Sequence, residues 1–96
     1  MAFEIVWTSK SYEDIASIYE YLVEKNSVTT ANKIIDEIFE ALSRITYPEQ
    51  FQFDEYRKEC RRIIVRNYKI LYYHTNDTIA IMRVFNTYQN PIRSLK

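Results

Sequence analysis

Basic side chains are concentrated in the second half of this sequence. In the stretch from residue 61 to residue 83 they are Arg61, Arg62, Arg66, Lys69 and Arg83. The planar guanidinium group donates paired hydrogen bonds to phosphate or carboxylate oxygens, so this set predicts a surface for an anionic ligand. Tyrosines in the same half, among them Tyr68 and Tyr88, offer ring faces on which nucleic-acid bases can stack.

The same stretch is typical of β-strands. Residues 61–74 and 78–85 are rich in β-branched and aromatic side chains, which predicts three short strands joined by two tight turns. We expect one face of this sheet to be apolar and the other cationic, with Arg61, Lys69 and Arg83 brought together around the anion. The alternative interpretation is that individual arginines pair with carboxylates of the chain itself, such as Asp54.

Several other kinds of site are disfavoured by the composition. The chain contains no glycine, which excludes a glycine-rich phosphate loop, and one histidine with one cysteine makes no zinc site. We therefore expect neither a metal nor a cofactor. His74, at a predicted strand end, and Cys60, at a predicted strand start, are better explained as structural residues than as a catalytic base and a nucleophile.

The totals indicate one small folded domain spanning residues 1–96. The sequence is 47% hydrophobic and 16% aromatic, and its formal net charge is zero. Residues 1–50 carry four Lys/Arg and nine Asp/Glu, whereas residues 51–96 carry nine and four, so the halves differ in sign. A lone cysteine and the lack of any long apolar run predict a cytoplasmic protein that does not contact a membrane.

The first half predicts one strand and two helices. Residues 3–7 alternate as a short strand, and Thr8 or Ser11 then begins an amphipathic helix that ends near Asn26. Ser27 or Thr29 begins a second amphipathic helix, which ends before Pro48. Because glycine is absent, we expect three asparagines to take any left-handed backbone conformation: Asn26, Asn67 and Asn76.

These elements predict an α+β fold with the order β-α-α-β-β-β. The two helices have similar lengths and a short polar connection, so we expect an antiparallel helical hairpin. Its apolar edge would pack on a small, mainly antiparallel sheet. Residues 49–56 read as a loop or irregular strand, with Phe51 and Phe53 held against the core.

Three segments resemble the RelE/ParE toxin superfamily. They are the start Val6-Trp-Thr8 with Ile15, Ile18 and Tyr19, the segment Arg61-Arg-Ile-Ile-Val-Arg-Asn-Tyr-Lys-Ile-Leu-Tyr72, and Ile79-Ala-Ile-Met-Arg-Val-Phe85 leading to Asn90-Pro91. The likeness spans nearly the whole chain in the right order. It implies a RelE/ParE-like fold and the toxin of a type II toxin–antitoxin module, a class that includes plasmid stabilisation and addiction proteins.

The resemblance implies two alternative activities. One branch cleaves mRNA on the ribosome without a metal, and it would give catalytic roles to Arg61, Lys69, Arg83 and Tyr88. In that chemistry the ribose 2′-OH attacks, cations stabilise the charge on phosphorus and an acid protonates the leaving oxygen. The other branch inhibits DNA gyrase and cleaves nothing, and a protein-binding relative without activity is a third alternative. Many members carry a histidine and basic residues before the proline, where this chain has Asn86, Thr87, Tyr88 and Gln89.

The resemblance also implies a partner. A cognate antitoxin wraps such toxins and covers their active surface, and an exposed sheet edge or a helical hairpin is a suitable place for it to bind. We expect three further residues to contact RNA or a partner protein: Arg62, Arg66 and Tyr68. The sequence leaves open whether the chain forms a homodimer.

Overall fold

The computed structural model describes residues 3–88 and has the predicted element order. Strand β1 (Glu4–Trp7) leads into helices α1 (Ser9–Lys25) and α2 (Val28–Leu42). A single turn of 3₁₀ helix (Pro48–Gln50) and a loop follow. Strands β2 (Arg61–Val65), β3 (Tyr68–His74) and β4 (Thr78–Asn86) complete the chain.

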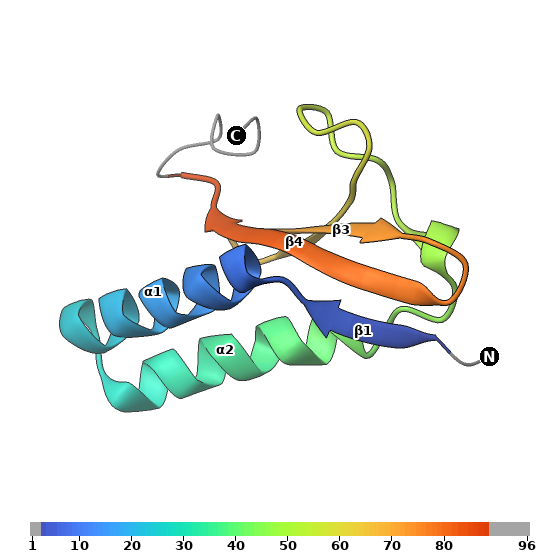
Figure 1. Cartoon of the computed structure of the whole chain (residues 1–96). Helices are drawn as coiled ribbons and strands as arrows, with labels where there is room; N and C mark the ends of the chain where they lie inside the picture. Colours follow the sequence, from blue (N-terminus) through green and yellow to red (C-terminus); the bar gives the residue numbers. More distant parts are fainter. Residues whose placement is uncertain (1–2, 89–96) are drawn as a thin grey trace.

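The four strands form one sheet in the order β1-β4-β3-β2. β2, β3 and β4 are antiparallel neighbours, whereas β1 runs parallel to β4, so the sheet is mixed. Figure 1 shows α1 and α2 on one face of this sheet, and the loop before β2 on the other. The α+β prediction is confirmed.

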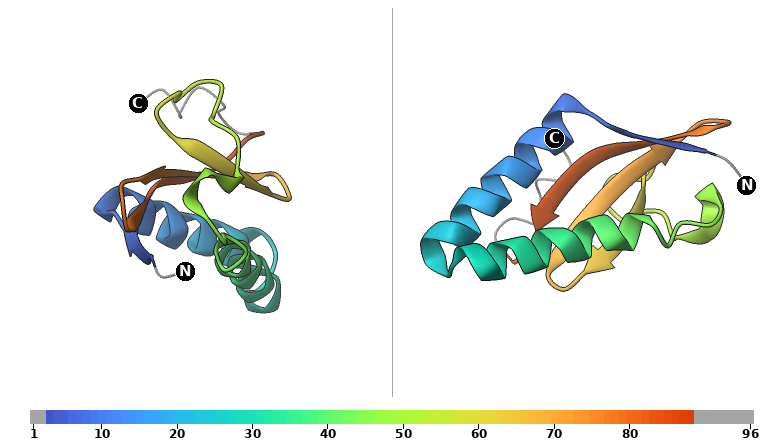
Figure 2. Two further views of the ribbon diagram at one scale, coloured as in Figure 1. Left: turned by 90° about the vertical axis from the view of Figure 1, so that its right-hand side faces the viewer. Right: turned by 90° about the horizontal axis from the view of Figure 1, so that it is seen from below.

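The helix starts follow from their capping residues. Thr8 accepts a hydrogen bond from the backbone N–H of Ser11, and Ser27 does the same for Thr30. The earlier of the two predicted starts is therefore correct for both helices. The two helices lie beneath the sheet and diverge from the turn that joins them (Figure 2).

The core lies between the helices and the sheet. Its fully buried members include Ile38 from α2, Ile70 and Tyr72 from β3, and Ile79 and Ile81 from β4. The hydroxyl of Tyr72 donates a 2.7 Å hydrogen bond to the carbonyl oxygen of Pro48, which satisfies this buried polar group.

Two local predictions are wrong. Among residues 3–88 the residue with a left-handed backbone conformation is Arg66, with φ of 56°. We expected this conformation at one of the three asparagines. Arg66 occupies the two-residue turn between β2 and β3, where a hairpin of this length demands positive φ. Phe51 packs against the core as expected, but Phe53 is 52% exposed, and its ring lies against the guanidinium of Arg61 and not in the core.

Candidate functional site

Lys69 lies on the sheet face opposite the helices. It sits opposite Ile64 on β2 and one residue from Ile70, whose side chain belongs to the helix-side core. Its ammonium group lies 2.7 Å from a carboxylate oxygen of Asp54, and Tyr56 and Phe85 place their rings 5.3 and 5.7 Å from it. The Lys69 side chain is only 6% exposed, so the loop before β2 seals this cation inside the fold.

Asp54 is the centre of this loop. Besides Lys69 it accepts hydrogen bonds from the backbone N–H groups of Tyr56 and Arg57, each at 2.9 Å. Burial alone would raise the pKa of Asp54, but the hydrogen bonds from Lys69 and from the two backbone donors prevail and lower it. Asp54 therefore stays ionised and opposes the charge of Lys69.

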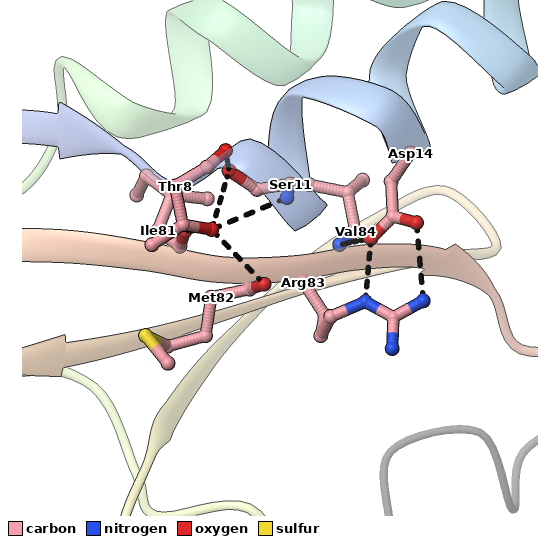
Figure 3. Close-up of polar contacts among 7 residues, drawn as sticks. All are labelled: Thr8, Ser11, Asp14, Ile81, Met82, Arg83 and Val84. Carbon is pink, nitrogen blue, oxygen red and sulfur yellow. Dashed lines mark hydrogen bonds and ion pairs between the residues drawn. The ribbon is translucent and has the colours of Figure 1, made fainter. Parts of the chain in front are cut away.

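Arg83 is likewise held by a carboxylate of its own chain. Figure 3 shows Asp14 reaching from α1 to Arg83, with Nε and Nη2 at 2.8 and 3.1 Å from its two oxygens. Asp14 also accepts the backbone N–H of Val84 at 3.0 Å. The hydrogen bond to Asp14 raises the pKa of Arg83 further, so this pair is a permanent ionic clamp between α1 and β4.

Thr8 adds a second clamp between the same elements. Its hydroxyl caps α1 and donates a 2.7 Å hydrogen bond to the carbonyl oxygen of Ile81, as Figure 3 shows. Ser11 is fully buried next to it and donates back to the carbonyl oxygen of Thr8. The pairing of β4 with β3 shifts by one residue here, because Leu71 pairs with Arg83 and the next residue, Tyr72, pairs with Ile81.

The remaining arginines of β2 and its turn are engaged as well. Arg66 forms a two-pronged pair with Glu37 of α2, with Nη2 at 2.9 Å from one oxygen. Arg62 lies 3.5 Å from Glu55. Arg61 donates from Nη1 to the carbonyl oxygen of Phe51 at 2.8 Å.

The expected cationic face is therefore wrong as an arrangement. Arg61 sits opposite Tyr72 and shares the helix side of the sheet, whereas Lys69 points to the opposite side. Tyr68 is buried at 4% exposure and has no open ring face, while Tyr88 is 85% exposed at the end of the described chain. The structure does not bring these residues together, and their roles in RNA cleavage stay predictions.

The structure instead places unpaired cations in a pocket at the open edge of β3, which we call the His74 pocket. β3 continues for two residues past Arg61, the first residue of β2, and the loop residues run beside it. The pocket has a volume of about 320 Å³ and is lined by Phe53, Lys58, Glu59, Arg61, Tyr72, Tyr73 and His74. Sequence reasoning missed it because the loop that completes it has no periodic pattern.

A second, apolar cavity lies between the diverging helices, and we call it the Trp7 groove. It has a volume of about 410 Å³ and is lined by Trp7, Tyr12, Ile15, Ala16, Tyr19, Glu20, Ile35 and Phe39. Phe39 packs edge-on against Trp7 at 5.4 Å and is 45% exposed, and Tyr12 is 72% exposed. Large aromatic side chains left this open on a helical hairpin mark a surface suited to a partner protein.

The sequence matches a family described as ParE toxin of type II toxin-antitoxin system, parDE, over residues 5–91. The chain belongs to this ParE toxin family. It is thus the toxin of a type II toxin–antitoxin module, and such a toxin has an antitoxin as its partner. A comparison with curated protein sequences gave no significant match.

Solved structures share the fold of this ParE-family toxin. A chromosomal ParDE toxin–antitoxin system from P. aeruginosa aligns with a TM-score of 0.75 at 18% identity, covering 88% of this chain and 95% of that one. The free E. coli toxin RelE, in a mutant form, aligns with a TM-score of 0.55 at 14% identity, covering 98% and 93%. The conserved hypothetical protein HP0894 from Helicobacter pylori aligns with a TM-score of 0.55 at 13% identity, covering 88% of this chain and 93% of that one.

Two further observations concern the described residues alone. No helix among residues 3–88 is long and apolar enough to cross a membrane. The same residues contain no group of three or more His, Cys, Asp or Glu side chains that could hold a metal ion.

Proposed function

We propose that this ParE-family toxin acts in the cytoplasm by binding DNA gyrase, and that it does so without cutting RNA. Membership of the ParE family supports this choice, because gyrase inhibition is the activity that the resemblance assigns to the ParE branch. In this proposal residues 1–96 work as a single domain that presents surfaces to proteins.

The observation that carries the proposal is the engagement of the cations expected to hold a scissile phosphate. Lys69 is sealed against Asp54, and Arg83 is clamped by Asp14 with 14% of its side chain exposed. A cation buried against a carboxylate within the fold has little left for a developing phosphorane charge. Freeing either one would leave a carboxylate buried without its partner, at a large cost in free energy.

We assign the antitoxin to the Trp7 groove. The groove is apolar and open, and an amphipathic helix laid along it would bury Tyr12 and Phe39. Acidic side chains of the same helices, including Glu13, Glu20 and Glu40, would favour basic residues flanking the apolar stripe of that helix. The occupied groove would also prevent a second copy of the chain from binding there.

Two assays with the purified toxin test the activity. We expect inhibition of gyrase supercoiling, together with intact transcripts in a cell-free translation reaction that contains ribosomes. Cleavage of the mRNA with normal supercoiling would overturn the proposal and identify the other branch of the superfamily. In that case Arg61→Ala and Arg83→Ala variants, checked for folding by urea denaturation, would show whether these arginines act on RNA.

A further inference from the structure

The basic residues between Arg57 and Arg83 divide into two groups. Five of them lie within 4.0 Å of a carboxylate: Arg57, Arg62, Arg66, Lys69 and Arg83. Within the described part of the chain Lys58 and Arg61 have no such partner. Both line the His74 pocket, so the two cations between residues 57 and 83 that lack a carboxylate partner meet at one place.

Arg61 differs from the arginines that bind carboxylates in this protein. Arg66 and Arg83 each use Nε and Nη2 to hold the two oxygens of an acid. Arg61 instead uses Nη1 for the carbonyl oxygen of Phe51, and its Nε is buried without a hydrogen-bond partner among residues 3–88. The charge of Arg61 is therefore satisfied by one neutral acceptor only, which favours an anionic ligand beside it.

The ring of Phe53 fixes the plane of this guanidinium. The guanidinium carbon lies 3.9 Å from the ring centroid, a stacking distance at which the charge is also stabilised. Arg61 is thereby preorganised, so that little rotamer entropy is lost when an anion binds. Stacking on Phe53, the hydrogen bond from Nη1 to Phe51 and the burial of Nε leave Nη2 as the donor that can meet an acid.

The surroundings favour a single carboxylate over a nucleic-acid backbone. Phe53 and Tyr73, which are 52% and 45% exposed, supply ring surface for the aliphatic part of a side chain. Glu59 lines the pocket, and Glu49 lies 3.8 Å from His74, so a chain of phosphates would meet two negative groups. With a net charge of zero and only two cations between residues 57 and 83 without a carboxylate partner, counterion release would contribute little to binding of a polyanion.

We propose that the His74 pocket binds an acidic side chain of the antitoxin, with the guanidinium of Arg61 as the anchor and Lys58 as the second charge. This inference rests on the proposed antitoxin binding and adds a charged anchor to the apolar contact in the Trp7 groove. An antitoxin that occupies both the Trp7 groove and the His74 pocket binds more tightly than through either one, and its register on the toxin is fixed.

The test uses the intact toxin and its cognate antitoxin. Binding is measured by calorimetry for wild type, Arg61→Gln and Lys58→Gln, with Arg44→Gln as the matched control for an exposed charge just after α2. We expect Arg61→Gln to weaken binding about 30-fold and Lys58→Gln less, as for a buried charge pair that loses one member. Arg44→Gln should bind as wild type does, and urea denaturation confirms that each variant is folded.

A double-mutant cycle then identifies the acid. Each Asp and Glu of the antitoxin is replaced by its amide, and one replacement should weaken binding to wild type yet cost nothing further with Arg61→Gln. Unchanged affinity of both pocket variants, or strict additivity for every acid, would overturn the inference while leaving antitoxin binding intact. Failure of wild type to bind the antitoxin would overturn the proposed partner itself. Binding of a labelled single-stranded RNA that depends on Arg61 would assign the pocket to phosphate instead.

Discussion

The ammonium group of Lys69 and the carboxylate of Asp54 lie 2.7 Å apart, and neither side chain is more than 6% exposed. Asp54 belongs to the loop before β2, and Lys69 belongs to the central strand β3. The pair therefore fastens the loop onto the outer face of the sheet. Cys60, Leu71 and Phe85 form a small apolar cluster on that face.

Removing one member of this pair should be far more damaging than removing both. We expect Asp54→Leu to destabilise the protein by about 3–5 kcal/mol, because it leaves the ammonium of Lys69 buried without a counter-charge. The double variant Asp54→Leu/Lys69→Met replaces both by apolar groups and should recover most of that loss. Urea denaturation measures both values. A single variant that loses less than about 1 kcal/mol would show that Lys69 reaches solvent in the native state.

The pair should also make stability depend on pH in the acid range. The pKa of Asp54 lies below its ordinary value because the hydrogen bonds from Lys69, Arg57 and Tyr56 outweigh its burial. A lowered folded pKa contributes stability above the unfolded pKa, about 3.9, and the contribution is lost as the pH falls through the folded value. Wild type should therefore lose stability relative to the double variant below about pH 4. Parallel curves for the two proteins from pH 7 to pH 3 would contradict this.

The clamp between α1 and β4 gives a separate prediction. Asp14→Ala removes the acceptor of two Arg83 donors and of the Val84 N–H at once. We expect a loss of about 2–4 kcal/mol in the free energy of unfolding, because a partly buried guanidinium and a backbone donor lose their partner. Glu13→Ala, the neighbouring acid on the exposed side of α1, is the matched control and should change stability by less than about 0.5 kcal/mol. Equal effects of the two changes would rule out the clamp.

The fold was predictable because its signals are local. Thr8 and Ser27 mark the helix starts by capping chemistry, and alternation of apolar residues marks the strands. The parallel pairing of β1 with β4 was not predictable from such signals, because it joins residues that are more than seventy positions apart. Arg66 took the left-handed turn position because the two-residue hairpin fixes the backbone there, whatever the propensity of the neighbouring Asn67.

The candidate site was harder to predict than the fold. A list of cations in sequence does not show which carboxylate each will meet, and Asp14 meets Arg83 across 69 positions. Strand alternation places Arg61 and Arg62 on opposite faces, but the loop from Phe51 to Cys60 has no period from which its path can be read. Its path decides that Lys69 is buried and that Arg61 meets no carboxylate.

The Trp7 groove predicts variants that lose the antitoxin but keep the fold. Tyr12→Glu places a charge on a side chain that is 72% exposed, so the free toxin should keep its stability within about 0.5 kcal/mol. Burial of that charge beneath an apolar helix should weaken antitoxin binding by about 100-fold. Tyr47→Glu, at an exposed tyrosine outside the groove, is the control and should bind normally. Equal affinity of the two variants would move the antitoxin to another surface.

The thiol of Cys60 should report opening of the loop. Cys60 is 1% exposed, and burial raises its pKa, so both access and thiolate content make it slow to react with a disulfide reagent. Its carbonyl oxygen accepts a hydrogen bond from the backbone N–H of Asp54 at 2.8 Å, which ties the thiol to the same loop that Lys69 holds.

In Asp54→Leu this loop should open locally. The rate at which the Cys60 thiol reacts should rise about tenfold for each 1.4 kcal/mol of lost local stability. Asp14→Ala weakens the contact between α1 and β4 and leaves this loop unchanged. At mild urea concentrations the Cys60 thiol of this variant should therefore react faster only through global unfolding. If both variants accelerate the thiol in proportion to their global stability, then the loop does not open on its own and the pair with Lys69 holds the whole fold together, not one segment of it.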